Sequence, residues 1–173
     1  MFLVISGSLN PKSRSRVLGR DCFSRLQAAK HETKWFDLCD TPLPPCDGGA
    51  AYGHENVQAL SKLIGDAKGI FIASPVYNFD VNSVVKNAVE LTGRAWTGKV
   101  VAMMMSAGGQ GSYMSGMGLA NSLMLDFRCI IVPRFVYTTE AAIEGDKIVD
   151  SDLSDRMAQL VTETTKIANA LAQ

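Results

Sequence analysis

Short apolar runs alternate with amphipathic segments along the whole chain. Four runs are apolar at nearly every position, which is typical of strands that helices cover on both faces of a sheet. A fifth run is weaker because polar residues interrupt it. The four strong runs are residues 2–6, 69–74, 100–105 and 129–132, and the weaker one is 33–38.

Between the runs, apolar side chains recur at the spacing of one helix face. The five helical segments cover residues 17–26, 57–64, 81–91, 119–127 and about 153–172. Strand and helix therefore alternate five times. This order predicts an α/β fold in which right-handed crossovers build a parallel sheet, with ligands bound beyond the carboxyl ends of its strands.

Two segments depart from this regular order. Residues 41–53 form a long loop after the weak strand, which we interpret as a surface loop. Residues 144–147, with the sequence EGDK, predict a turn between two short extended pieces.

Composition narrows the function classes. The 173 residues suit a single domain, residues 1–173, with a sizeable core. Seventeen basic and seventeen acidic residues cancel, so no overall field favours nucleic acid or an anionic membrane. The apolar start is too short for a signal peptide and no run has membrane-spanning length, so we expect a soluble cytoplasmic protein.

Cysteine and histidine positions point to no protein-based catalyst. The four cysteines lack the CxxC spacing of metal sites, so we expect reduced thiols and no metal. A redox pair of Cys39 and Cys46 is the less favoured alternative. His31 and His54 are interpreted as surface residues. Because no base is found beside a nucleophile, no catalytic side chain is assigned.

Residues 7–15, GSLNPKSRS, follow the first strand and are the first candidate for ligand binding. A glycine ends the strand and serines lead into a helix, so backbone N–H groups at the positive helix end are available to an anion. Hydroxyl, amide and cationic side chains add donors for a phosphate. Helix capping by the same serines is the structural alternative. The spacing is that of neither a P-loop nor a G-x-G-x-x-G motif.

Two further loops follow the third and fourth strands, at the same edge of the predicted sheet. Residues 74–79, SPVYNF, combine a rigid proline with two aromatic rings, and the N–H groups of Tyr77 and Asn78 are available to a planar heterocycle. Residues 106–112, SAGGQGS, let the backbone approach a flat ligand. Each loop alone is explained as a plain turn. Together, the three loops predict a site for a mononucleotide with a flat aromatic head.

These segments resemble the NAD(P)H-dependent FMN reductases of the flavodoxin-like superfamily, which include quinone, chromate and azo-dye reductases. GSLNPKSRS stands in the place of the family's G-S-x-R-x-x-S-x-N loop, SPVYNFDVNSVVKNAVE in that of its P-x-Y-N segment, and SAGGQGS in that of its glycine loop. The resemblance implies a flavodoxin-like three-layer sandwich with a five-stranded parallel sheet of order 2-1-3-4-5. It also implies FMN as cofactor, NAD(P)H as co-substrate, and a homodimer or homotetramer.

The same resemblance assigns site residues by position, in three groups. The expected contacts of the FMN phosphate are Ser8, Asn10, Ser13 and Ser15. Those along the isoalloxazine ring are Pro75, Val76, Tyr77, Asn78 and Phe79, and those closing its other side are Ser106, Ala107, Gly108 and Gly109.

The chain departs from the family pattern mainly at the phosphate. Asn10 stands where the family usually has Arg, and Ser15 where it usually has Asn. Arg14 or Lys12 is therefore the candidate replacement cation. Asn82 also replaces the usual proline. These departures leave the phosphate contacts less specified than the ring contacts.

The hypothesis that follows is a ping-pong oxidoreductase. NAD(P)H gives hydride to the flavin and leaves, and a small oxidised acceptor, with quinones as the leading class, takes its place. The sequence does not distinguish NADH from NADPH. Two alternatives stay open: a flavodoxin-like electron carrier, against which the zero net charge argues, and a ligand-sensing module of the same fold that binds no flavin.

Overall fold

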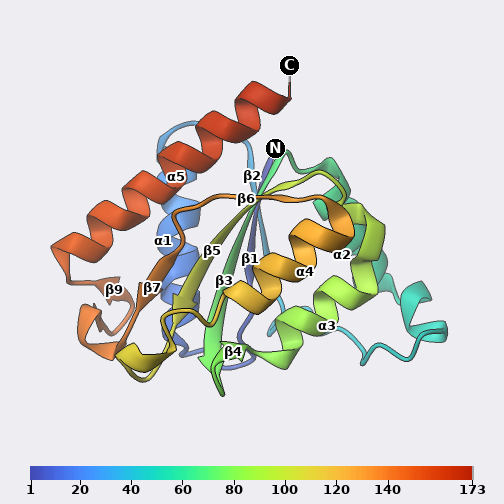
Figure 1. Cartoon of the computed structure of the whole chain (residues 1–173), viewed down its shortest axis with the longest axis horizontal. Coiled ribbons are helices and arrows are strands. Elements are labelled where there is room, and N and C mark those ends of the chain that lie inside the picture. Colours follow the sequence, from blue (N-terminus) through green and yellow to red (C-terminus); the bar gives the residue numbers. More distant parts are fainter. Residues whose placement is uncertain (173) are drawn as a thin grey trace.

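One sheet lies at the centre of the computed structural model, which describes residues 1–172 (Figure 1). Its parallel strands follow the order β2-β1-β3-β5, and β6 and β7 share the last position beside β5. The predicted order 2-1-3-4-5 and the flavodoxin-like fold are thereby confirmed. The strands are β1 (Phe2–Ser6), β2 (Thr33–Asp37), β3 (Gly69–Tyr77), β4 (Asp80–Val81), β5 (Val100–Ser106), β6 (Ile130–Ile131) and β7 (Val136–Thr138).

Two strands differ from their predicted extents. β3 was expected to end at Ser74, but it continues through Pro75, which pairs with Ser106 of β5. Proline is tolerated here because β1 ends opposite Ala73, so the central ladder has lost one neighbour. The fifth strand was expected at 129–132 only. It is split into β6 and β7, since residues 132–135 between them contain Pro133.

Helices cover both faces of this sheet. On one face lie α1 (Arg14–Ala28) and α5 (Ser151–Leu171), and on the other α2 (Glu55–Asp66), α3 (Ser83–Thr92) and α4 (Met117–Phe127) (Figure 1). Four of the helices begin at a side chain that accepts a hydrogen bond from an N–H two or three residues later. These N-caps are Ser13, His54, Asn82 and Asp150.

Side chains from each central strand alternate between two apolar layers. In β1, Phe2 and Val4 pack in the layer of α1 and α5, whereas Leu3 and Ile5 pack in the layer of α2, α3 and α4. All four are almost fully buried. The unbroken apolar runs in the sequence thus reflect burial on both faces.

Outside the sheet, the two irregular segments have different outcomes. Residues 144–147 form the predicted turn, which joins β8 (Ile143–Glu144) to β9 (Lys147–Ile148) in an antiparallel hairpin. The loop at 41–53 contains a single turn of 3₁₀-helix at Ala50–Gly53.

All four cysteines are free thiols, so Cys39 and Cys46 are not joined. Within residues 1–172, no helix combines the length and apolar character needed to cross a bilayer.

Candidate functional site

The three loops singled out from the sequence meet at one edge of the sheet and enclose a cavity of about 450 Å³. They follow the carboxyl ends of β1, β3 and β5, at the lower edge of the sheet in Figure 1. The volume is in the range of small-molecule sites. The cavity is lined by Asn10, Lys12, Ser13, Arg14 and Ser15 from the first loop, Pro75, Val76 and Tyr77 from the second, and Ser106, Ala107 and Gly108 from the third.

Four predicted site residues lie outside this lining. Ser8 is buried beneath the first loop, where its Oγ accepts a hydrogen bond from the N–H of Asn10 (3.2 Å). Asn78 and Phe79 form the tip of the turn between β3 and β4, and Gly109 lies one residue past the lining. Ser8 therefore shapes the loop, while Asn78 and Phe79 stand at the mouth of the site.

The first loop combines both roles considered for it. Asn10 Oδ1 accepts the N–H of Lys12 (2.9 Å), so the amide that replaces the family's Arg folds the loop back on itself. Ser13 caps α1 by accepting the N–H of Arg16 (3.2 Å), and its Oγ lies 3.1 Å from that of Ser15. The remaining N–H groups of the first turn have no partner within the helix, which leaves them available to an anion.

Carboxylates hold the two arginines of this region. Arg14 pairs with Glu140 at 2.5 Å, on the partly exposed rim. Arg16 pairs with Asp37 at 2.8 Å and with Asp40 at 2.7 Å. Partial burial would lower the pKa of Arg16, but the hydrogen bond to Asp40 and the charge of Asp37 outweigh it and raise that pKa. Arg16 is therefore a fixed structural cation.

Asn82, which sequence reasoning treated only as a departure from the family, joins the first loop to α3. Its buried Nδ2 donates to the carbonyl of Gly7 (2.6 Å), and its Oδ1 accepts the N–H of Val85 (3.3 Å) at the start of α3. Gly7 itself has no room for a side chain, because a Cβ would lie 2.3 Å from Val85 Cγ2. An asparagine just before a helical pattern was the available signal, since Asn is a favoured N-cap.

The second loop ends in a strained, exposed turn. Asn78 and Phe79 have φ of 51° and 67°, in the left-handed region that residues other than glycine rarely adopt. Such strain concentrates at functional sites. Tyr77, on the cavity side, is 57% exposed, so one aromatic face is available to a ligand.

The third loop is held in place by hydrogen bonds to β7, a strand that the sequence did not predict. The N–H of Ala107 donates to the carbonyl of Thr138 (2.9 Å), and the Tyr137 hydroxyl donates to the carbonyl of Gly109. A Cβ at Gly108 would meet no atom within 4 Å, so the space beside this loop is open.

Residues 1–143 match the family described as NADPH-dependent FMN reductase. The chain belongs to this family. It is thus an oxidoreductase of the NAD(P)H-dependent FMN and quinone reductase type, as the resemblance of its three loops to that family implied.

Relatives of this reductase share its sequence at a moderate level. It is 28% identical over 177 residues to the NADPH-dependent FMN reductase ArsH of Shigella flexneri, covering 95% of this chain and 67% of that one. It is 28% identical over 137 residues to a quinone reductase of Pseudomonas putida, covering 75% and 73%. The solved structure of the flavoenzyme FerB from Paracoccus denitrificans has a TM-score of 0.79 at 20% identity, covering 98% and 97%, which supports the fold.

Proposed function

We propose that residues 1–173 act as one FMN-binding unit that passes hydride from NAD(P)H to a small oxidised acceptor, with quinones as the leading class. The observation that carries this proposal is the single cavity shared by all three loops. Its chemistry suits FMN: hydroxyls, helix N–H groups and cations line one end, and an aromatic face with backbone lines the other. Bound FMN supplies the hydride chemistry, and the protein binds and orients it.

The residues divide the work of holding FMN. Ser13 and Ser15, with the first N–H groups of α1, would hold the phosphate, and Lys12 supplies positive charge there. Tyr77 would lie along the ring, and Ala107 and Gly108 would close its other side. Because no side chain is assigned a proton transfer, the protein's contribution is placement of the ring and its reactants.

The mouth of the site is apolar, and we extend the proposal to a homodimer or homotetramer. Tyr77, Phe79 and Met117 are each between 42% and 57% exposed. Met117 begins α4 beside β4, since a Cβ at the adjacent Gly118 would lie 3.5 Å from the Asp80 carboxylate. Exposed apolar surface of this kind marks interaction sites. Light scattering during size-exclusion chromatography measures the mass, and a monomer would contradict this extension.

An absorption spectrum tests the central proposal. We expect a cytoplasmic protein that is yellow when purified. Its flavin absorption bands should disappear on addition of NADPH and return on addition of a quinone. An electron carrier would keep its yellow colour with NADPH for much longer, as stopped-flow mixing would reveal. A colourless chain that takes up no added FMN would contradict the proposal.

A further inference from the structure

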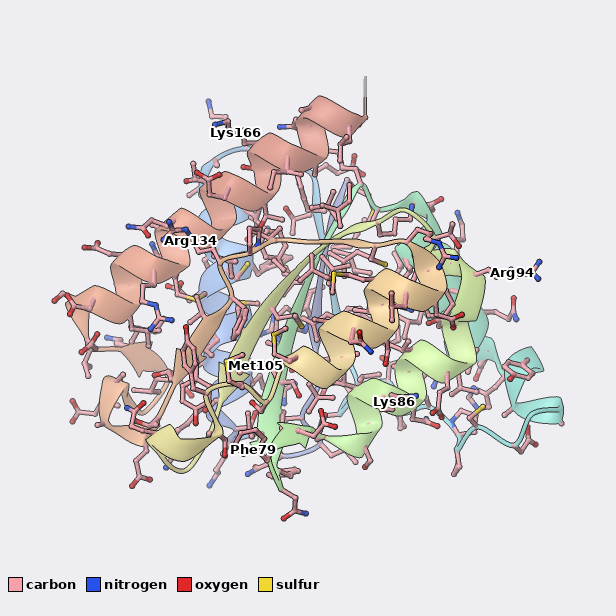
Figure 2. All side chains as sticks on the ribbon, in the orientation of Figure 1. Phe79, Lys86, Arg94, Met105, Arg134 and Lys166 are labelled. Carbon is pink, nitrogen blue, oxygen red and sulfur yellow. The ribbon has the colours of Figure 1, made fainter. Side chains whose placement is uncertain are left out.

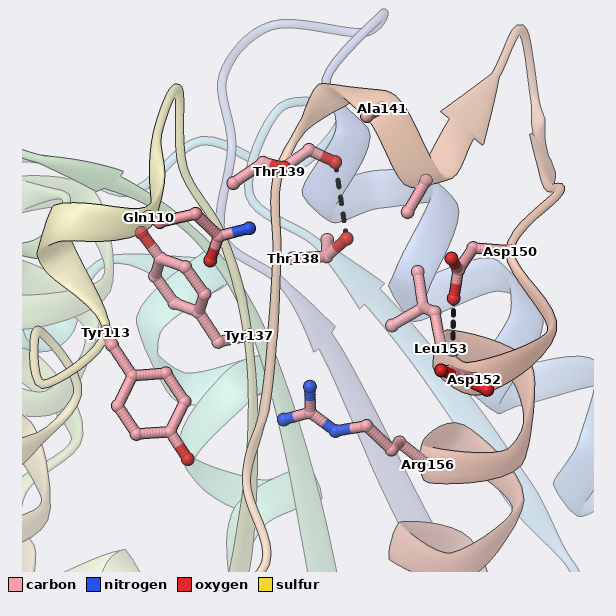
Figure 3. Close-up of a pocket in the computed structure, with 11 residues that line it drawn as sticks. Gln110, Tyr113, Tyr137, Thr138, Thr139, Ala141, Asp150, Asp152, Leu153 and Arg156 are labelled. Carbon is pink, nitrogen blue, oxygen red and sulfur yellow. Dashed lines mark hydrogen bonds between the residues drawn. The ribbon is translucent and has the colours of Figure 1, made fainter.

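A second cavity lies on the far side of the third loop from the flavin cavity. It has a volume of about 290 Å³ and lies between Gln110 of that loop and the first turns of α5 (Figure 3). Nothing in the proposed function uses it. Its two notable walls are an aromatic pair, Tyr113 and Tyr137, and a single arginine, Arg156.

The aromatic wall is preformed. The rings of Tyr113 and Tyr137 pack edge to face, with centroids 5.6 Å apart and planes at 68°. Phe135 supports Tyr113 from another side at 5.9 Å. Its two aromatic neighbours hold the Tyr113 ring in place. Because Tyr113 is still 49% exposed, part of its ring surface is available to another planar ring.

Arg156 is a half-buried cation of the same cavity. Asp152 lies one helical turn earlier, at the spacing that allows an ion pair. Among residues 1–172, however, no carboxylate lies within 4.0 Å of the Arg156 guanidinium. Its guanidinium instead extends toward the tyrosines (Figure 3).

Two carboxylates of the same cavity limit the charge of its ligand. Asp150 is committed to capping α5, since its Oδ1 accepts the N–H of Leu153 (2.6 Å), and Asp152 is exposed on the rim. Both still repel negative charge. A dianionic phosphate would meet two like charges for one cation, whereas a carboxylate or sulfonate with a single charge is matched by Arg156.

We propose that this cavity binds a planar aromatic molecule that carries one negative charge, an aryl carboxylate or sulfonate. The ring lies against Tyr113 and the anion meets Arg156. The cavity contacts the third loop through Gln110, and Tyr137 of its wall donates a hydrogen bond to Gly109 of the same loop. A ligand here is therefore coupled to the loop that closes the flavin site and should alter turnover there; this last step rests on the proposed function.

Calorimetric titration of the purified full-length protein with 2-naphthalenesulfonate tests the binding directly. Arg156→Gln should weaken binding about tenfold, because it removes a charge-assisted contact, and Arg156→Lys should restore part of it. Tyr113→Leu should weaken it severalfold. The matched control is Arg94→Gln, which removes an exposed guanidinium on the other side of the molecule (Figure 2) and should change nothing.

Two further probes decide the ligand class. Uncharged 2-naphthalenemethanol should bind more weakly than the sulfonate and should not respond to Arg156→Gln. Adenosine 2′,5′-bisphosphate should not compete with the sulfonate. Competition that depends on Arg156 would make this a dinucleotide phosphate site and overturn the proposal, as would equal sulfonate affinity in the wild type and Arg156→Gln.

Kinetics separates this proposal from the proposed function. With uncharged 1,4-naphthoquinone as acceptor, added 2-naphthalenesulfonate should change the KM of the wild type, and Arg156→Gln should raise the sulfonate concentration needed for that change about tenfold. Without the sulfonate, Arg156→Gln should leave kcat and KM unchanged. The same sulfonate dependence in the wild type and in Arg156→Gln would contradict coupling between this cavity and the flavin site. A wild type that never oxidises NADPH would contradict the proposed function instead, and the titration would still stand on its own.

Discussion

The two ends of the candidate flavin cavity are built on opposite plans. At the phosphate end, the chain uses much of its own polar chemistry: Asn10 folds the loop, Ser13 caps α1, and carboxylates hold Arg14 and Arg16. At the ring end, Tyr77 is exposed on a strained turn. The difference teaches that ion pairs and hydrogen bonds within a charged loop leave fewer of its groups free to bind a ligand. An exposed aromatic ring on a rigid backbone keeps its whole face available. Most of the flavin affinity should therefore come from the ring end.

The largest effect is expected where the phosphate loop touches α3. Gly7→Ala places a Cβ 2.3 Å from Val85 Cγ2 and 3.0 Å from the Ala73 carbonyl. The free energy of unfolding should fall by about 3 kcal/mol, the cost of overpacking a rigid interior. Urea denaturation measures it. The control is Gly65→Ala in α2, where a Cβ meets nothing within 4 Å and stability should not fall.

A somewhat smaller loss is expected from Asn82→Ala. The change leaves the buried Gly7 carbonyl unpaired and uncaps α3, which should lower the free energy of unfolding by about 2 kcal/mol. Asn82→Asp separates the two roles, because it keeps a capping oxygen and loses the donor to Gly7. If Asn82→Ala were as stable as the wild type, the loop and α3 would not be coupled through this side chain.

Tyr77→Ala tests the ring end without touching the core. Loss of the aromatic face should weaken the binding of FMN and of riboflavin by about 1–2 kcal/mol each, because the lost contact is to the ring that both flavins share and not to the phosphate. Quenching of flavin fluorescence measures both dissociation constants. Tyr77→Phe keeps the ring and should retain most of the affinity. A loss confined to FMN would reverse the comparison between the two ends.

The smallest effect concerns the rim ion pair at the phosphate end. Glu140→Gln frees Arg14 and removes a nearby negative charge, so FMN should bind about threefold tighter and riboflavin should not change. Lys12→Gln should weaken FMN by a similar factor and again spare riboflavin. The ratio of the two flavin affinities isolates the phosphate. An unchanged ratio in both variants would show that this end contributes no charge to binding.

Sequence reasoning reached the fold and most of the cavity for a physical reason. Short continuous apolar runs are typical of strands buried on both faces, and the loops that follow parallel strands lie at one edge of the sheet. The helices, the hairpin turn and the strands apart from β4 and β7 were accordingly placed, and the loops after β1, β3 and β5 do enclose one cavity. The errors lie at two prolines, Pro75, which was interpreted by local rules alone, and Pro133, which the sequence analysis did not consider. Pro75 stays in its strand and Pro133 splits one, because the neighbouring strands decide which ladder bonds matter.

What the sequence determined by itself is thus the order of elements, the sheet edge that carries the site, and the family-type motifs within its three loops. What only the tertiary structure decided are contacts between residues far apart in the chain: Asn82 with Gly7, Glu140 with Arg14, and Tyr137 with Gly109. Hydrophobic periodicity is a local property of the chain, so one sequence suffices to show it. Partner choice by a polar side chain depends on which groups folding brings within about 3 Å, and no spacing along the chain encodes that.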